Sequence, residues 1–194
     1  MTGGKYIVAT KDNGIQIAIR NILNPGGYFY LEHCGDAGTL LRLVRSYHPE
    51  LIVVDAAMLP GELRSTLETI DSEILCAILL LGDYNDPAVN SLIEGSNAIS
   101  ICPKPVNREL LLHTADMSVM NYRRVLALGA KLRQMTDNYE SRKQVEVAKA
   151  MLMDREGLSE KEAYERIRKR SMDERLSMRT IADLVIHSYK TRDS

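Results

Sequence analysis

The chain has 194 residues, of which 45% are hydrophobic and 26% are charged, and its formal net charge at pH 7 is −1. This length accommodates one medium-sized domain and a smaller one, each with its own core. No apolar run approaches the roughly 20 residues that span a bilayer, and the first residues lack the apolar segment of a signal peptide. We therefore expect a cytoplasmic protein that does not interact with membranes.

The residue types that most often carry catalysis or bind metals are scattered along the chain. Cys34, Cys76 and Cys102 lie far apart and show no C-x-x-C spacing, which argues against a disulfide framework and a zinc site. The four histidines are isolated, and the sequence contains no nucleophile motif or glycine-rich phosphate-binding loop. An enzyme is the least favoured class. We assign no catalytic residue and no metal ligand, and we expect no required cofactor.

The first 115 residues alternate between short apolar runs and helical patterns. We expect strands at 5–10, 28–33, 50–57, 74–81 and 98–102, separated by helices around 15–23, 40–44, 63–70 and 87–94. Continuous apolar strands between helices are typical of a parallel sheet that is covered on both faces. Functional groups in such sheets gather beyond the carboxyl ends of the strands.

The motif HPELIVVDAAMLPG from His48 carries Asp55 at the end of an apolar strand, and EGSNAISICPKPV from Glu94 carries Lys104 before a proline. On these motifs, residues 4–115 resemble a response-regulator receiver domain, which has a flavodoxin-like α/β fold. The resemblance places Asp55 at the position of the phosphoacceptor and Lys104 at the switch lysine. An aspartate at a strand end can attack a phosphoryl donor, and a lysine across the site can pair with the product. The resemblance also implies a sensor kinase or another regulatory protein as a partner.

The expected acidic pocket departs from the receiver pattern at two places. The adjacent acids that hold Mg²⁺ in receivers match Thr10 and Lys11 here, with Asp12 one position further on, and the hydroxyl residue after the fourth strand matches Gly82. Lysine is a poor substitute for an oxygen ligand, whereas Lys11 can pair with Asp55 and mimic the charge of the metal. The sequence leaves two readings open, a phosphorylated receiver and a pseudo-receiver, and Mg²⁺ is expected only if Asp55 is phosphorylated.

From Asn107 the pattern becomes helical and meets no strong breaker before Gly157. The apolar residues Val125, Leu128, Leu132, Met135 and Tyr139 are spaced 3, 4, 3 and 4, which is an a/d seam of about two heptads. We assign 116–141 to a coiled-coil connector and favour a parallel homodimer. The alternative is that this helix packs along its own receiver domain.

Residues 142–186 contain three short amphipathic segments separated by two breaks. The first buries Val145, Ala148 and Leu152, and Gly157 ends it in the left-handed conformation. Ser159 and Glu162 form a capping box that starts a second helix through Ala163, Ile167 and Met172. A third helix begins near Ser177 and is expected to bury Ile181, Leu184 and Val185. Helices this short need a partner, so we predict an all-α three-helix bundle at 142–194.

This last quarter of the chain contains the motifs AKAMLM at 148–153, GLSEKEAY at 157–164, RIRKRSM at 166–172 and IA at 181–182. In their order and spacing it resembles the ANTAR domain, the RNA-binding output module of bacterial antitermination regulators. It implies a dimeric bundle that binds paired hairpin loops in nascent RNA. The charge distribution agrees, because residues 1–115 carry 8 basic and 13 acidic side chains and residues 142–194 carry 13 and 10.

Single-stranded RNA loops are bound by stacking bases on aromatic or guanidinium planes while basic groups neutralise phosphate. Tyr164 fits the stacking role, although it also fits a tyrosine packed at the bundle surface. The basic run fits RNA contact or, alternatively, helix solvation through Glu162 to Arg166 and Glu165 to Lys169 pairs. The RNA-binding candidates are Lys149, Tyr164, Arg168, Lys169, Arg170, Arg175 and Arg179.

Together these patterns predict a two-part regulator of transcription antitermination. Two alternatives stay open: a DNA-binding response regulator with a helix-turn-helix, and a dimeric signalling module that contacts only proteins. A helix-turn-helix requires a tight turn after about eight helical residues, whereas the second helix is expected to continue through Met172.

Overall fold

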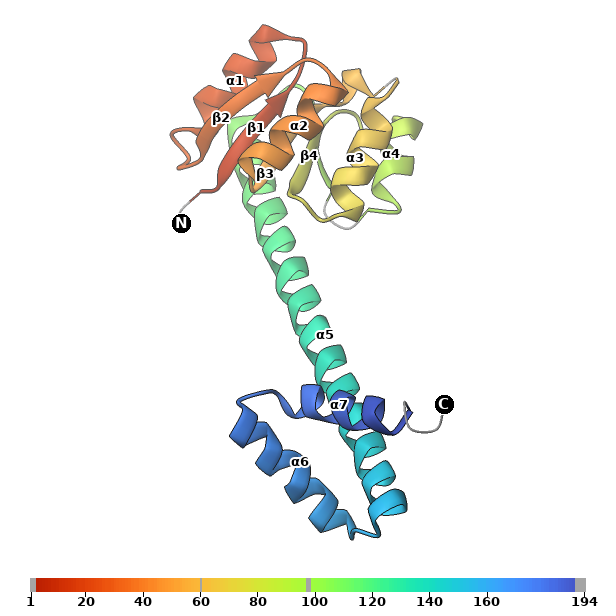
Figure 1. The fold of residues 1–194 in the computed structure, drawn as a ribbon. Coiled ribbons are helices and arrows are strands. Elements are labelled where there is room, and N and C mark those ends of the chain that lie inside the picture. Colours follow the sequence, from red (N-terminus) through yellow and green to blue (C-terminus); the bar gives the residue numbers. More distant parts are fainter. Residues whose placement is uncertain (1–2, 60, 97–98, 191–194) are drawn as a thin grey trace. The chain divides into compact units, whose positions relative to one another are not determined.

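The computed structural model describes residues 3–59, 61–96 and 99–190, the last of these without its side chain. The chain forms two compact units, Met1–Leu128 and Gly129–Ser194, and each unit is described by itself below (Figure 1). None of the helices in the described part of the chain combines the length and the apolar composition that a membrane span requires.

The first unit is a five-stranded parallel sheet with the strand order β2-β1-β3-β4-β5. Its strands are β1 (Lys5–Ala9), β2 (Phe29–Cys34), β3 (Leu51–Asp55), β4 (Ala77–Leu81) and β5 (Ile99–Cys102). β1, β3 and β4 are inner strands, and nearly all of their side chains are buried because helices cover both faces of the sheet. This confirms the predicted flavodoxin-like α/β architecture.

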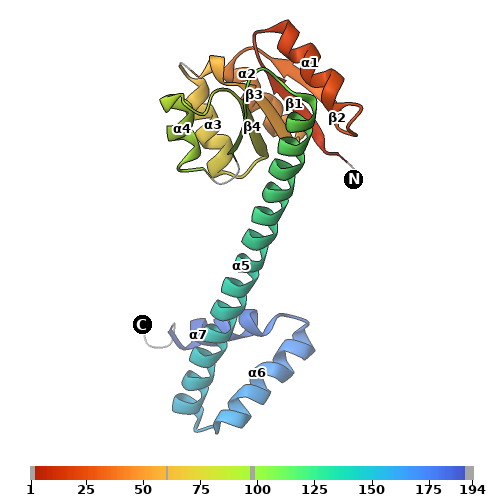
Figure 2. The ribbon, with the colours of Figure 1, turned by 180° about the vertical axis from the view of Figure 1, so that it is seen from behind.

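Alternate residues of each strand belong to two separate cores. Ile7, Ile52 and Ile78 face α2 (Ala37–Tyr47), α3 (Leu63–Ser72) and α4 (Pro87–Ile93). Val8, Val53 and Leu79 face α1 (Asn13–Leu23) and the first turns of α5 (Arg108–Glu156). Figure 1 looks onto the side of α2 and α3, and Figure 2 onto the side of α1 and α5.

Two of the predicted strands are longer than the observed ones, the third at its end and the fourth at its start, and both differences have a local cause. Asp55 ends β3 because its side chain accepts a hydrogen bond from the Ala57 amide, which opens the short 3₁₀ helix η1 (Ala56–Met58). β4 begins at Ala77 because Ile74 lies in the left-handed region with a φ of 51° and terminates α3. Ala98, with which we expected the last strand to begin, lies outside the described residues.

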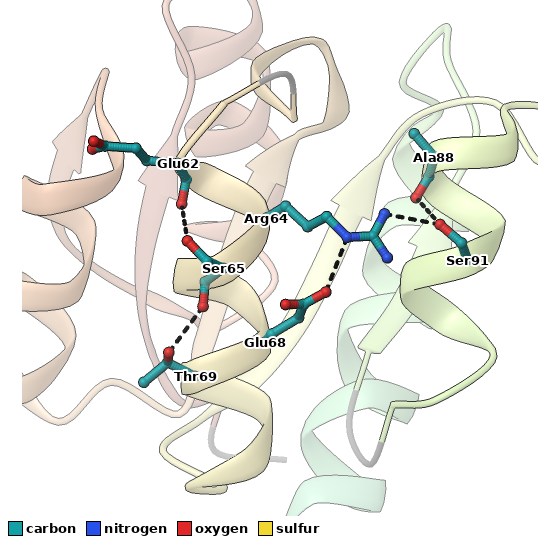
Figure 3. A network of polar contacts seen from close by, with 7 residues as sticks. All are labelled: Glu62, Arg64, Ser65, Glu68, Thr69, Ala88 and Ser91. Atoms are coloured by element: carbon teal, nitrogen blue, oxygen red, sulfur yellow. Dashed lines mark hydrogen bonds and ion pairs between the residues drawn. The ribbon is translucent and has the colours of Figure 1, made fainter.

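Polar side chains connect α3 to α4 on the outside of the first unit (Figure 3). The Nε atom of Arg64 on α3 donates to Glu68 at 2.9 Å, and its Nη1 atom donates to Ser91 Oγ on α4 at 2.9 Å. Ser65 and Thr69 hydroxyls donate to carbonyls one turn earlier in the chain. This network holds the seven-residue helix α4 against α3 on the exposed surface.

The α5 helix runs without interruption through the predicted connector, from Arg108 to Glu156. The continuous helical pattern between Asn107 and Gly157 is therefore confirmed, and Gly157 ends the helix with a φ of 68°. Gly129 lies inside the helix, where the cost of a glycine relative to alanine is about 1 kcal/mol.

The second unit packs the end of α5 against α6 (Glu160–Glu174) and α7 (Met178–Lys190), as the sequence predicts. Its core contains Val145, Ala148, Leu152, Ala163, Ile167, Ile181, Ala182 and Val185. One prediction is wrong: Leu184 is 41% exposed, and Ala182 is buried in its place. Ala182 and Val185 are three residues apart and share one side of α7, whereas Leu184 projects from the flank of that side.

Candidate functional site

Asp55 lies in a polar pocket at the carboxyl edge of the sheet. The parallel register pairs Ala9 with Val54, Asp55 with Leu81, and Leu81 with Cys102, so the residues that follow β1, β3, β4 and β5 converge at one edge. Thr10, Asp55 and Gly82 occupy these ends, and Lys104 reaches the site from beyond β5. The pocket beside Asp55 has a volume of about 620 Å³, and its lining includes Lys11, Asp12 and Lys104.

Both oxygens of the Asp55 carboxylate already have protein partners. Lys104 Nζ lies 2.5 Å from Oδ1, which also accepts the Ala57 amide at 2.9 Å. Thr10 Oγ1 donates to Oδ2 at 3.2 Å. Because Asp55 is only 4% exposed, the lysine charge compensates a carboxylate that would be costly to bury alone.

The side chains at the receiver metal positions do not match the oxygen-rich ligand set that Mg²⁺ prefers. Thr10 stands where an acid is expected, and Lys11 contributes a positive charge at the rim of the pocket. Asp12 uses its carboxylate to cap α1, accepting the amides of Gly14 and Ile15 at 2.7 and 3.1 Å. These residues therefore do not fit a divalent cation.

The sequence suggested that Lys11 can pair directly with Asp55, and the structure places Lys11 elsewhere. Its side chain is exposed, and among the described residues the ion pair of Asp55 is with Lys104. The positive charge that balances Asp55 therefore comes from the end of β5.

Gly82 leaves no room for the hydroxyl side chain that receivers carry at this position. A Cβ atom at Gly82 would lie 2.7 Å from the Cβ of Ala56, closer than two such atoms approach in proteins. Ala56 is itself buried directly after Asp55. The glycine and the alanine thus fit each other, and the sequence alone did not reveal this contact.

The second candidate site is the basic surface of the second unit. α6 starts with the predicted capping box, in which Ser159 Oγ accepts the Glu162 amide while the Glu162 carboxylate accepts the Ser159 amide at 2.9 Å. This box lowers the pKa of Glu162, because the carboxylate accepts hydrogen bonds from Ser159. Ala163 and Ile167 are buried and Ser171 is partly buried, while the other residues of α6 are exposed.

Most of the predicted RNA-binding side chains lie on the surface of this bundle. Arg168 pairs with Glu165 at 3.3 Å, Arg170 with Glu174 at 2.5 Å, and Arg179 with Glu140 at 3.3 Å. Lys169 and Arg175 are exposed and have no ion pair among the residues that the structure describes. Arg175 is the left-handed C-cap of α6, with a φ of 54°.

Lys149, another predicted RNA-binding residue, is placed where it holds the bundle together. It is 6% exposed, and its Nζ atom lies 2.8 Å from Glu146 on the same helix and 2.8 Å from Glu160 on α6. These hydrogen bonds raise the pKa of Lys149. Its ammonium group is thus occupied by two carboxylates that join α5 to α6.

The candidate RNA-binding residues taken from the sequence did not include two exposed residues of α6, Lys161 and Met172. Tyr164 is 41% exposed, and Lys161 and Arg168 lie three residues before it and four after it, so the three share one side of the helix. Met172, which is 61% exposed, continues this side by one more turn. A helical projection centred on the buried pair Ala163 and Ile167 would have identified Lys161 and Met172.

The predicted seam residues of α5 are largely uncovered. Leu128, Leu132, Met135 and Tyr139 are each more than 60% exposed, while Val125 is partly buried. Large apolar side chains at regular helical spacing on a surface are typical of a protein interaction site.

Comparison with known families identifies the second unit. Residues 133–186 match the family model of the ANTAR domain. This match begins within the predicted connector and ends in α7. The transcriptional regulatory protein PdtaR of Mycobacterium tuberculosis is 23% identical over 187 residues, which cover 96% of this chain and 91% of that protein.

Solved structures show the fold of the first unit. The receiver domain of the response regulator NarL from M. tuberculosis superposes with a TM-score of 0.54 at 15% identity and covers 62% of this chain and 98% of its own. The receiver domain of an HD domain-containing protein from Pseudomonas fluorescens gives a TM-score of 0.55 at 17% identity, covering 63% and 98%. The first unit thus has the receiver fold.

Proposed function

We propose that this chain, which combines a receiver fold with an ANTAR match, is a response regulator that controls transcription antitermination by binding hairpins in nascent RNA through α6 and the basic residues around it. The observation that carries the proposal is the ANTAR match at 133–186, which includes the whole exposed side of α6. The first unit then regulates the second.

The exposed side of α6 has the chemistry that a loop of RNA requires. Tyr164 offers an aromatic plane for stacking a base, and Arg168, four residues later, offers a guanidinium plane and a positive charge. Lys169 and Arg175 add two charges that no carboxylate of the described residues neutralises. The exposed pair of Arg168 with Glu165 is worth at most about 1 kcal/mol and can be exchanged for phosphate.

Two bundles acting together explain how a weakly basic domain can bind tightly. The segment 142–194 has a net charge of only +3, and phosphate contacts supply much of the affinity for nucleic acids. The exposed Leu128, Leu132 and Met135 on α5 provide a seam for a parallel homodimer. Linking two bundles raises the effective concentration of the second for the second hairpin of a pair.

We propose that the receiver unit is a pseudo-receiver whose state does not depend on metal-assisted phosphorylation. Lys104 and Thr10 occupy the Asp55 carboxylate, and Gly82 has no group for a phosphoryl oxygen. The regulatory partner is then a protein that binds the receiver rather than a sensor kinase that phosphorylates it.

Acetyl-phosphate labelling of the full chain tests this proposal. We expect no label at Asp55 with or without Mg²⁺, and the same result for wild type and Asp55→Asn. Label that disappears in Asp55→Asn would show a working phosphoacceptor and contradict the pseudo-receiver.

RNA binding is tested by anisotropy of a labelled RNA carrying two hairpins, selected for binding to the full chain from a library with random loops. We expect the Arg168→Glu/Lys169→Glu double variant to bind at least about a hundredfold more weakly, because two attractive contacts become repulsive. The Arg42→Glu/Arg108→Glu variant, which changes the net charge equally on the receiver unit, should bind like wild type.

Duplex DNA as a competitor separates this function from a helix-turn-helix. α6 spans 15 residues without a tight turn, which disfavours that motif. We expect unlabelled duplex DNA to compete far less than unlabelled RNA. Equal competition would favour a DNA-binding regulator, and the absence of any salt-dependent binding would favour a module that contacts only proteins.

A further inference from the structure

A small pocket lies between the three helices of the second unit. Its volume is about 200 Å³, which accommodates a few water molecules or one small ionic group and is below the size of typical cofactor sites. The floor is apolar and belongs to the bundle core, whereas the rim is polar and combines residues of α5, α6 and α7. The rim residues are Glu156, Arg166, Arg170, Ser188 and Tyr189.

The rim of this pocket already holds a negative charge. The Oε1 atom of Glu156, the last residue of α5, accepts a hydrogen bond from the Tyr189 hydroxyl at 2.5 Å. Its Oε2 atom accepts a hydrogen bond from Arg166 Nη1. α6 and α7 therefore donate to the same carboxylate. Donors that converge in this way, with a guanidinium among them, also suit a phosphate group.

Arg170 brings a second guanidinium to the pocket. It lies four residues after Arg166, so the two arginines share one side of α6. Its Nε atom donates to Glu174 at 2.5 Å, and a guanidinium has four further N–H donors. Among the described residues, the lining thus contains two arginines and one carboxylate, that of Glu156.

This pocket lies on a different side of α6 from Tyr164 and Arg168. Arg166 is two residues from each of them, and two residues correspond to about 200° of rotation around an α-helix. Lys169 is exposed between the two sides. An RNA loop that crosses α6 therefore meets positive charges on both flanks of the helix, where they can neutralise phosphates of the two strands of the loop.

The contacts of Glu156 are weak enough to be exchanged for a ligand. The side chains of Arg166 and Glu156 are 55% and 31% exposed, and exposed ion pairs contribute at most about 1 kcal/mol. A backbone phosphate carries the same charge as the carboxylate. Its neutralisation also releases counterions from the RNA, which favours the exchange.

We propose that Arg166, Arg170 and Tyr189 form a cradle for a backbone phosphate of the bound RNA, and that Glu156 occupies this cradle in the free chain. This rests on the proposed RNA binding and adds to it a contact on a second side of α6. It also adds an intramolecular competitor, since Glu156 must release its two donors before the phosphate binds.

The substitution Glu156→Gln tests the competition. Glutamine can still accept both hydrogen bonds but lacks the charge, so we expect the two-hairpin RNA to bind about threefold more tightly in the anisotropy assay. Asp154→Asn is the matched control, because it removes the same charge from an 83% exposed side chain that is not part of the pocket lining. Glu156→Gln that binds no more tightly than Asp154→Asn would overturn the proposal.

The substitution Arg166→Gln tests the cradle itself. We expect about tenfold weaker binding, and a log–log slope of affinity against salt that is smaller by about 1, because one phosphate contact is lost. Arg155→Gln removes the same charge outside the pocket lining and should leave the slope unchanged. If circular dichroism shows that Arg166→Gln is unfolded, Arg170→Gln gives the same test without breaking the Glu156 contact. A slope equal to that of the control would refute the cradle.

The failure of the cradle is distinguishable from the failure of the proposed function. If the wild-type chain binds no two-hairpin RNA, both are refuted. If it binds, and Arg168→Glu/Lys169→Glu does not, while Arg166→Gln binds like Arg155→Gln, the function stands and the cradle alone is refuted. In that case, stabilisation of Glu156→Gln by inorganic phosphate, relative to chloride at equal ionic strength, would assign the pocket to a free anion instead of RNA.

Discussion

At the scale of single residues, the pocket around Asp55 departs from the receiver pattern. An ion pair and a close packing contact stand where receivers have metal ligands and a hydroxyl group for the phosphoryl oxygen. Asp55 and Lys104 occupy the places that the receiver resemblance assigns to them, and they form an ion pair. The sequence could not show that Gly82 is fitted to Ala56, because this contact joins two strand ends that are distant in the chain. It also could not show that Lys149 is buried between two glutamates.

The contact of Gly82 with Ala56 predicts a cost for restoring the receiver pattern. Gly82→Ala should lower the free energy of unfolding by about 1–3 kcal/mol, because the added methyl group overpacks a buried site. Denaturant unfolding of the full chain measures this loss. Ala56→Gly introduced into Gly82→Ala should recover most of it, and a double variant as unstable as the sum of the two single variants would contradict the contact.

Lys149 and its two partners, Glu146 and Glu160, form a clamp between α5 and α6. This clamp predicts that the stability of the second unit depends on pH. Lys149→Met should destabilise the second unit by about 1 kcal/mol at neutral pH, since hydrogen bonds to charged groups are lost while the exposed glutamates regain water. The hydrogen bond from Lys149 lowers the pKa of Glu160 below its ordinary value of 4.5. A group whose pKa is lowered on folding stabilises the fold above its unfolded pKa, and this stabilisation is lost as pH falls through the folded value.

The difference between wild type and Lys149→Met should therefore shrink as the pH is lowered below about 4.5 and be constant between pH 6 and 8. Thermal unfolding followed by circular dichroism at several pH values measures it. A difference that grows on acidification would contradict the clamp.

At the scale of elements, the sequence patterns located each α-helix and β-strand of the described chain but not the short η1, because apolar periodicity and capping residues act locally. The boundaries were less predictable. Ile74 continues an apolar run that reads as strand, yet it adopts a left-handed conformation that ends α3. Leu184 fits the apolar period of α7, yet its exposure depends on the angle at which α7 packs, which no local pattern encodes.

The capping box of α6 predicts a measurable effect on that helix. Ser159→Ala removes the hydroxyl that accepts the Glu162 amide and should reduce the stability of the second unit by about 1 kcal/mol. Ser141→Ala is the control, because Ser141 lies inside α5 and only donates back to the Asp137 carbonyl, so its loss should change the melting temperature little. Equal effects of the two variants would argue against the box.

At the scale of the whole molecule, the chain joins a receiver fold to an ANTAR domain through one helix of 49 residues. The resemblance to both families was visible in the sequence, and the family comparisons agree with it. What the sequence could not provide is which apolar side chains of α5 are exposed, since this depends on which side of the helix the sheet covers. The exposed apolar residues of α5, Leu128, Leu132, Met135 and Tyr139, are therefore as important to the proposed function as the basic side of α6.

The central claim is that binding of RNA hairpins by paired bundles changes transcription termination. The most direct measurement is the fraction of transcripts that read through an intrinsic terminator in a purified transcription system, with the selected paired hairpins placed upstream. We predict that the wild-type chain and Arg42→Glu/Arg108→Glu increase readthrough, whereas Arg168→Glu/Lys169→Glu and Leu132→Glu/Met135→Glu do not. Readthrough that stays unchanged while the wild-type chain saturates the hairpins would contradict the account.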